Sequence, residues 1–181
     1  QLQSCDAIEW GSEFQDLKIN SDFSFDISIK QGSNIKTKKV DLIVGSDGIR
    51  SSVRNYITNN KTDKLHYLDC MVVLGICNLN DLQKPLHYLL DSETVFQSSD
   101  GKKRIYVMPY DAKSVMWQLS FLISENEAKE LAEKGKPALK SEALKISSWH
   151  SPIPEILNAT PVNSISGYPV YDRKLLKQDD F

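Results

Sequence analysis

Apolar and polar residues alternate along the first quarter of the chain, as they do in half-buried strands. The clearest stretch has an apolar residue at every second position: Phe23, Phe25, Ile27 and Ile29. Shorter strands are predicted over residues 7–10, 14–20 and 35–39, with a turn at 31–34. Alternation is lost at 40–44, where a nearly continuous apolar run predicts a strand covered on both faces. The pattern therefore predicts a β-meander that leads into a buried strand.

The middle of the chain has the pattern of a larger sheet. Residues 67–79 form a second candidate for a buried strand, and strand patterns lie on both sides of the Asp100-Gly101 pair. An Asp-Gly pair between two strand patterns predicts a hairpin. The next segment places a long row of apolar side chains on one face: Val115, Trp117, Leu119, Phe121 and Ile123.

Helical signals follow this long strand. Ser124 and Glu127 have the spacing of a capping box, Gly135 suits a helix end, and Pro137 suits the first turn of a second helix. The buried face of that second helix is predicted to hold Leu139, Ala143 and Ile146. One further helical turn is predicted after Pro154, and an extended tail ends the chain. The sequence thus predicts an α+β fold with a mixed, largely antiparallel sheet and flanking helices.

Composition and charge exclude several classes of protein. The 181 residues are 40% hydrophobic and 25% charged, which allows an ordinary core. A net charge of −2 argues against nucleic acid as the main partner, which would require a basic face. The longest apolar run, 71–77, is far shorter than the roughly 20 residues of a membrane span. The first residues have neither the basic start nor the apolar stretch of a signal peptide.

The cysteines and histidines indicate a reduced chain without a metal site. The three cysteines, Cys5, Cys70 and Cys77, form no Cys-x-x-Cys pair, so free thiols and a cytoplasmic location are expected. The three histidines are scattered and have no metal-ligand spacing. No metal-binding residue is therefore predicted.

The segment DLIVGSDGIRSSVR, residues 41–54, holds the candidate chemistry. A strand pattern ends at Gly45, Asp47-Gly48 follows, and a helix capped by Ser51 or Ser52 begins at once. Such a turn brings the backbone close to a ligand, and a carboxylate there can accept hydrogen bonds from ribose hydroxyls. Arg50 and Arg54 are four residues apart and share one helix face, where they could meet phosphate. The alternative interpretation is an ordinary strand-to-helix connection with a solvated arginine face.

This segment closely resembles the second fingerprint of the FAD-dependent aromatic hydroxylases, the p-hydroxybenzoate hydroxylase-like flavoprotein monooxygenases. Residues 106–131 and SGYPVYDR, residues 166–173, resemble segments of the salicylate-hydroxylase-like branch. The resemblance implies an FAD- and NAD(P)-binding α/β domain plus a substrate domain in the parent protein. Residues 1–57 would belong to the FAD-binding domain, 58–165 to the substrate domain, and 166–181 to a segment returning to the first.

The same resemblance implies roles for particular residues. Asp47 would contact FAD and the region used by NAD(P)H, and Gly48 would give backbone access, with Arg50 and Arg54 as further cofactor-binding candidates. The sheet of residues 70–123 would cover the flavin ring and line the pocket of a small, aromatic substrate. Its pocket candidates are Tyr106, Met108 and Trp117, although a core role is the alternative for each.

The implied reaction is hydroxylation with NAD(P)H and O2 through a flavin hydroperoxide, for which no side chain in this segment has to be catalytic. The family's first fingerprint, Gly-x-Gly-x-x-Gly, is absent from the spacing of the eight glycines. The chain is therefore expected to be an internal fragment that is inactive alone. Two alternatives stay open: a ligand-binding or structural domain without redox activity, and a related flavin-dependent halogenase or reductase. The sequence leaves the oligomeric state open.

Overall fold

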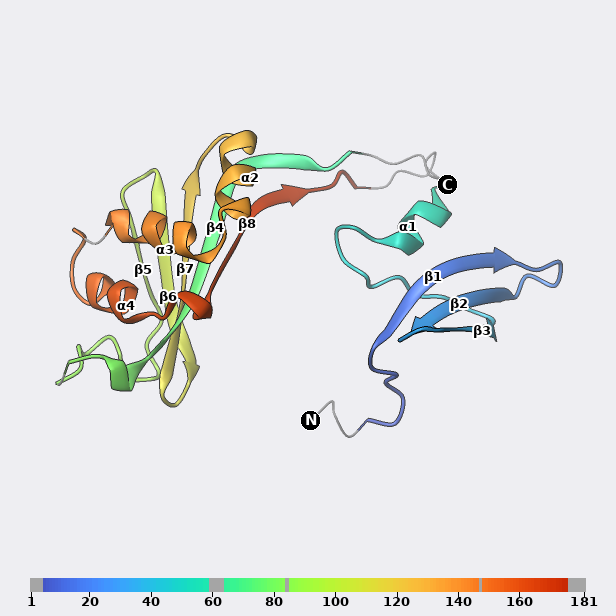
Figure 1. Ribbon diagram of the computed structural model, residues 1–181, viewed down its shortest axis with the longest axis horizontal. Helices are drawn as coiled ribbons and strands as arrows, with labels where there is room; N and C mark the ends of the chain where they lie inside the picture. Colours follow the sequence, from blue (N-terminus) through green and yellow to red (C-terminus); the bar gives the residue numbers. More distant parts are fainter. Residues whose placement is uncertain (1–4, 59–63, 84, 147, 176–181) are drawn as a thin grey trace. The chain divides into compact units, whose positions relative to one another are not determined.

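The computed structural model describes residues 5–58, 64–83, 85–146 and 148–175, and the chain divides into two compact units (Figure 1). Unit 1 contains residues 1–64 and 173–181, and unit 2 contains residues 65–172. All described strand pairs are antiparallel, and they form two separate sheets. The predicted α+β class with a largely antiparallel sheet is confirmed.

Unit 1 is built on a three-stranded meander. The strands β1 (Ser12–Ile19), β2 (Phe25–Gln31) and β3 (Asn34–Val40) pair in chain order. A single short helix, α1 (Ser52–Ile57), follows in the described part of the unit. The strand predicted over residues 7–10 is wrong, because that segment forms turns and irregular structure.

The buried strand predicted over residues 40–44 is also wrong. The strand β3 ends at Val40, and residues 42–48 form neither strand nor helix. Leu42 and Val44 are each 77% exposed. An isolated extended segment needs a neighbouring strand for its hydrogen bonds, and no described strand pairs with this one. The apolar run alone was therefore not sufficient to make a strand.

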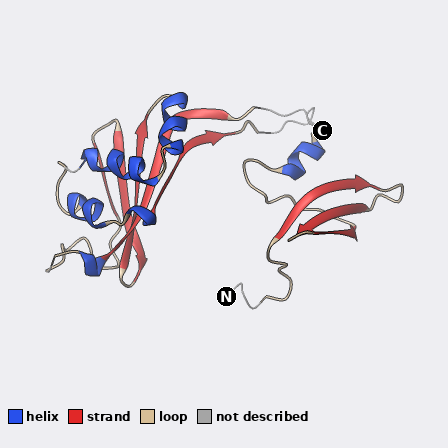
Figure 2. Ribbon diagram, in the orientation of Figure 1, coloured by secondary structure: helices blue, strands red, loops and turns tan. Residues whose placement is uncertain are grey.

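Unit 2 contains a five-stranded sheet with the order β5-β6-β7-β4-β8 (Figure 2). Two neighbouring strands of this sheet, β4 and β7, match the two longest strand predictions. The strands are β4 (His66–Asn78), β5 (Phe96–Ser99), β6 (Lys103–Asp111), β7 (Ser114–Leu122) and β8 (Ile165–Asp172). The Asp100-Gly101 pair closes the β5–β6 hairpin as predicted, and the Asp100 carboxylate accepts the backbone N–H groups of Lys102 and Lys103.

The first two helices of unit 2 begin where the sequence signals lie, whereas the third begins before Pro154 and is longer than the single predicted turn. Helix α2 (Glu125–Glu133) has the predicted Ser124–Glu127 capping box, and Gly135 follows it with φ +76°. Helix α3 (Lys136–Ala143) has its proline in the first turn, and α4 (Ile153–Ala159) follows Pro152. Short 3-10 turns, η2 (Leu79–Asp81), η3 (Leu144–Ile146) and η4 (Val162–Ser164), complete the unit.

One face of the five-stranded sheet packs against these helices and forms the core. Alternate residues of β4, β6 and β7 are buried there together with apolar residues of the helices: Met71, Val73, Ile105, Val107, Trp117, Leu119, Leu139, Ile153, Ile156 and Leu157. Trp117 is fully buried, and its Nε1 donates a hydrogen bond to Thr160 Oγ1 at 2.8 Å. The tryptophan is therefore a core residue and not a pocket residue.

Candidate functional site

Two glycines shape the connection between the end of β3 and α1. A Cβ added to Gly45 would lie 2.8 Å from Val53 Cβ, so only glycine lets this segment pass so close to the helix. Gly48 has φ +77°, a backbone conformation that glycine adopts without strain. A Cβ at Gly48 would meet nothing within 4 Å, so the backbone there is accessible. The two glycines thus serve different purposes: Gly45 allows close packing against α1, and Gly48 supplies the backbone geometry of the turn.

The Asp47 carboxylate holds the start of α1. Its Oδ1 accepts a hydrogen bond from Ser51 Oγ at 2.5 Å, and its Oδ2 accepts the backbone N–H groups of Ser52 at 2.7 Å and Val53 at 3.3 Å. The hydrogen bond from Ser51 is the largest of the effects that lower the pKa of Asp47 below its ordinary value. Ser51 in turn caps the helix by accepting the N–H of Arg54 at 3.0 Å, as predicted. Sequence reasoning missed that Asp47 binds its own helix.

The two arginines of the segment occupy different settings. Arg50 lies in the exposed turn before the helix, so the prediction that both arginines share a helix face is wrong. Arg54 lies inside α1, is half-buried, and donates through Nη2 to the carbonyl of Lys174 at 3.1 Å. A solvated arginine face therefore does not describe Arg54.

The far end of the described chain meets this turn. Arg173 donates through Nε to the carbonyl of Ile49 at 2.5 Å, a contact between residues 124 positions apart. Together with the contact between Arg54 and Lys174, it places residues 173–174 beside the Asp47–Arg54 turn within unit 1. Sequence reasoning gave Arg173 no role. The SGYPVYDR motif was the available signal, because the family resemblance implied that residues 166–181 return to the first domain.

A second candidate surface is the helix-free face of the five-stranded sheet, defined here by Leu74, Tyr106, Met108, Met116 and Gln118. These side chains alternate with the core residues, and no described helix contributes a core residue on their side. Tyr106 and Leu74 both pair with Gln118, while Met108 pairs with Met116, so the five form a continuous half-buried patch. Tyr106 and Met108 thus differ from Trp117, which points to the opposite face.

The described residues contain neither a metal-binding cluster nor a membrane-spanning helix. Within them, His, Cys, Asp and Glu side chains form no group of three that could hold a metal ion. None of the helices described is long and apolar enough to cross a bilayer. Cys5 is exposed, Cys70 is partly buried and Cys77 is buried, and all three are free thiols, as predicted.

Comparison with known proteins agrees with the resemblance seen in the sequence. No family model matches the chain. Aurachin C monooxygenase/isomerase of Stigmatella aurantiaca is 24% identical over 139 residues, which cover 76% of this chain and 32% of that protein. Klebsiella pneumoniae HpxO, solved with FAD and uric acid, aligns with a TM-score of 0.69 and 15% identity over 90% of this chain and 38% of its own.

The flavin-dependent halogenase CmlS has a related fold, with a TM-score of 0.60 and 10% identity over 88% of this chain and 27% of that chain. The chain therefore spans about a third of the length of its curated relative and a similar share of these solved proteins. It has the fold of part of the FAD-dependent monooxygenases, which confirms the predicted resemblance.

Proposed function

We propose that this chain is part of an FAD-dependent monooxygenase that uses NAD(P)H and O2 to hydroxylate a small, aromatic substrate. The observation that carries the proposal is the fold shared over 90% of the chain with a protein solved with FAD. Bound FAD would supply the oxygen chemistry, and the protein would orient the reactants and exclude water. In this chain no side chain is assigned a catalytic role.

In this proposal, unit 1 belongs to the FAD-binding domain, and Asp47, Gly48, Arg50 and Arg54 are its cofactor-binding residues. The turn fits part of such a role, because the Gly48 backbone is accessible and Arg50 is exposed. The cradle for the pyrophosphate would come from outside this chain, because no Gly-x-Gly-x-x-Gly occurs in it.

Unit 2 would be the substrate domain, with its helix-free face toward the substrate. That face offers two thioethers, an aromatic ring and one neutral amide, a set that suits the apolar faces of an aromatic ring. The core face would hold the sheet rigid behind it. We place the protein in the cytoplasm, a proposal supported by its three free thiols.

The first experiment compares this chain with a longer polypeptide, which also includes the residues encoded on both sides of it. The longer protein is expected to retain FAD through gel filtration and to oxidise NAD(P)H. This chain alone should bind FAD at least about a thousandfold more weakly, since about 4 kcal/mol of pyrophosphate contacts would be missing. A longer protein that never binds flavin would refute the proposal in favour of a ligand-binding or structural domain.

The second experiment tests Asp47 in the longer protein, with two matched controls. Asp47→Ala should weaken FAD binding or flavin reduction by roughly ten- to a hundredfold, because a charged acceptor is lost. Ser51→Ala loses the helix cap but keeps the carboxylate, and Asp100→Ala loses the other Asp-Gly carboxylate. Both controls should retain flavin. If Asp47→Ala and Ser51→Ala weaken FAD binding or flavin reduction equally, Asp47 acts only by stabilising the start of α1.

Halogenation is the second candidate function, and the fold shared with CmlS is the observation that favours it. A halogenase would convert its substrate only in the presence of chloride or bromide, whereas a hydroxylase would be indifferent to halide. Product mass spectrometry with and without bromide separates the two reactions.

A further inference from the structure

A serine and a histidine from two separate segments of unit 2 share a short hydrogen bond. Ser98 lies in β5, and His150 lies in the turn that leads into α4. Ser98 Oγ and His150 Nε2 are 2.6 Å apart, although 52 positions separate the two residues in the chain. A serine hydroxyl bonded to an imidazole nitrogen is the pair that makes a serine nucleophilic, because the ring can remove its proton.

The second ring nitrogen of His150 determines the direction of this hydrogen bond. His150 Nδ1 lies 2.8 Å from the carbonyl oxygen of Ser151. A carbonyl oxygen can only accept, so Nδ1 carries a proton. In the neutral ring Nε2 then has no proton and accepts from Ser98 Oγ. His150 is therefore in the tautomer that can take the proton of Ser98.

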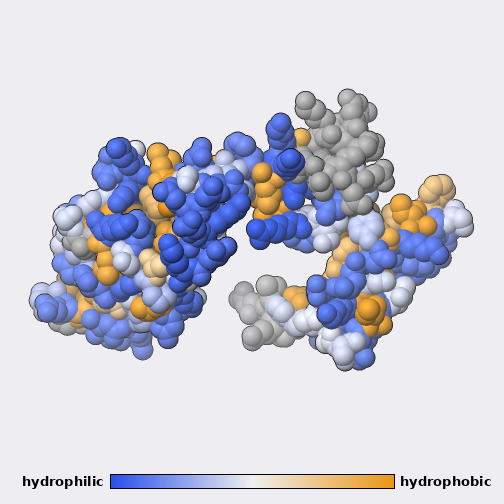
Figure 3. Space-filling model, turned by 45° about the horizontal axis from the view of Figure 1, so that its top comes forward, coloured by the Kyte–Doolittle hydropathy of each residue, from blue (hydrophilic) through white to orange (hydrophobic). Residues whose placement is uncertain are grey.

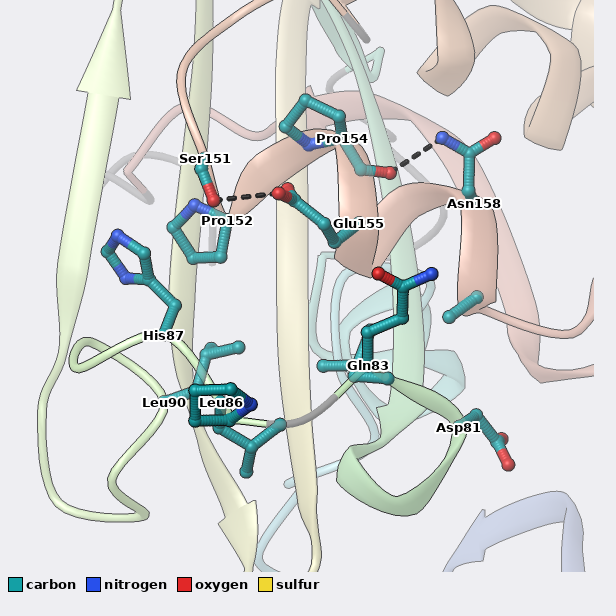
Figure 4. Close-up of a pocket in the computed structure, with 13 residues that line it drawn as sticks. Asp81, Gln83, Leu86, His87, Leu90, Ser151, Pro152, Pro154, Glu155 and Asn158 are labelled. Atoms are coloured by element: carbon teal, nitrogen blue, oxygen red, sulfur yellow. Dashed lines mark hydrogen bonds between the residues drawn. The ribbon is translucent and has the colours of Figure 1, made fainter.

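The turn that carries His150 is anchored to the start of α4. The carbonyl of His150 accepts the N–H of Ile153 at 3.1 Å, and Ile153 is fully buried. Figure 4 shows the side chains of Ser151 and Glu155 pointing toward each other, and Ser151 Oγ donates to Glu155 Oε1 at 2.7 Å. These contacts hold Ser151, whose carbonyl orients the imidazole, so the fold positions His150 independently of Ser98.

Ser98 lies at the edge of the five-stranded sheet, on its helix-covered face. Strand β5 is the first in the order β5-β6-β7-β4-β8, so described strands border it on one side only. Residues that pair across strands share a face of the sheet, and Ser98 pairs with Ile105, which is buried in the core. Ser98 itself is half-buried, so a small substrate can reach its hydroxyl.

The backbone N–H of Ser99 supplies a third part of an acyl-transfer site. Asp100 N donates to the carbonyl of Lys103 at 3.2 Å, which makes these two residues a hydrogen-bonded pair. Hydrogen-bonded and non-hydrogen-bonded pairs alternate in an antiparallel ladder, so the adjacent Ser99–Arg104 pair is of the second kind. The Ser99 N–H therefore points away from β6, toward the open edge. A donor one residue after the nucleophile can stabilise the oxyanion of an acyl-transfer reaction.

The surroundings of the dyad limit the esters that it can accept. His150 is exposed and Ser98 only half-buried, so water reaches the site and weakens the stabilisation of developing charge. An ester with a good leaving group is therefore required. Phe96, two positions before Ser98 on the same face, is half-buried and offers an apolar surface to an aryl group.

We propose that Ser98 and His150 form a dyad that hydrolyses small aryl esters of carboxylic acids. Ser98 Oγ attacks the ester carbonyl carbon, and its proton passes to His150 Nε2. The negative charge on the carbonyl oxygen is held by the Ser99 N–H until the bond to the aryloxy group breaks, and the leaving oxygen takes the proton from His150. Water, deprotonated by the same nitrogen, then releases the acid and restores Ser98. The reaction needs no FAD, so it stands or falls independently of the proposed monooxygenase function.

The test uses the chain as it is, with two probes: a fluorophosphonate, which labels serine hydroxyls activated by a base, and p-nitrophenyl acetate. Mass spectrometry of digested protein should find the phosphonyl group on Ser98. The ester should transfer its acetyl group to the same residue and release p-nitrophenol. Failure to label Ser98, or labelling of other serines in its place, would overturn the proposal.

Variants separate a reactive pair from an ordinary hydrogen bond. Ser98→Ala should abolish the labelling, and His150→Ala should slow it at least about a hundredfold, with partial recovery when imidazole is added. Both side chains reach solvent, so both variants should fold, which circular dichroism verifies. Two matched controls should leave the rate unchanged: Ser120→Ala, which removes another hydroxyl of the same sheet, and His66→Gln, which removes another exposed imidazole. An unchanged labelling rate in His150→Ala would show that the histidine is no base and would refute the dyad.

Discussion

The two units of this chain make similar use of strand patterning and reach different degrees of burial. In unit 2 the alternate residues of β4, β6 and β7 are sealed by α2, α3 and α4, and side chains as large as Trp117 have no exposed surface. In the described part of unit 1, Val53 is the one buried apolar residue, at 8% exposure. Alternating apolar and polar residues can form a strand, but a hydrophobic core needs a second layer of secondary structure packed on the sheet.

The surface of unit 1 reflects this difference. Ile19, Phe23, Ile35, Leu42 and Val44 are all exposed, and Figure 3 shows apolar colour interrupting the polar surface of this unit. Its helix α1 reaches β1 through Tyr56, whose ring meets Phe14 edge to face at 5.9 Å and whose hydroxyl donates to Asp16. One short helix covers too little of a three-stranded sheet to bury these residues.

The largest expected difference in stability is between truncating a core residue of unit 2 and truncating an exposed apolar residue of unit 1. Trp117→Ala should reduce the free energy of unfolding of unit 2 by about 3–5 kcal/mol, because it opens a cavity and removes the donor to Thr160. Leu42→Ala should change stability by less than about 0.5 kcal/mol, since the side chain is already in water. Urea unfolding followed by circular dichroism measures both. Similar losses would mean that unit 1 has a core of its own.

A smaller difference in stability is expected between alanine substitutions at two glycines. Gly75→Ala should cost unit 2 about 1–3 kcal/mol, because the new Cβ would lie 2.4 Å from Trp117 Cζ2. Gly48→Ala should cost unit 1 about 1 kcal/mol, through backbone strain alone.

Two further variants distinguish these causes in the same unfolding measurement. In a Trp117→Phe background, the cost of Gly75→Ala should fall, because the smaller ring leaves room. Gly48→Asn should cost less than Gly48→Ala, because asparagine tolerates positive φ. If Gly75→Ala costs as much in the Trp117→Phe background, the clash with Trp117 is not the cause of its effect. If Gly48→Asn costs as much as Gly48→Ala, the positive φ is not the cause.

The smallest effect concerns the pH dependence of α1. The folded-state pKa of Asp47 lies below its ordinary value of 3.8, so its stabilisation of α1 is fully present above that value. It should be lost as the pH falls through the folded-state pKa. The amide shifts of Ser52 and Val53 should therefore titrate below about pH 4.

Asp47→Asn should abolish that titration, whereas Asp100→Asn should leave it unchanged and remove a separate one at Lys102 and Lys103. A titration of Ser52 that survives Asp47→Asn would show that another group controls the start of the helix.

The sequence by itself determined the elements whose signals are local. The alternation through Val115, Trp117 and Leu119 identified both β7 and its core face, and the Ser124–Glu127 spacing identified the start of α2. The Asp100-Gly101 pair identified a hairpin, because both of its strands lie next to it in the chain. In each case the partners are a few residues apart, so the physical cause lies inside the pattern.

Tertiary structure decided the features whose partners are distant. The apolar run at 40–44 resembles a buried strand, but a strand exists only where another strand accepts its hydrogen bonds, and no described strand does. The contact of Arg173 with Ile49 joins residues 124 positions apart, so the pattern of apolar and polar residues around either one does not indicate it, although the SGYPVYDR motif implied a returning segment.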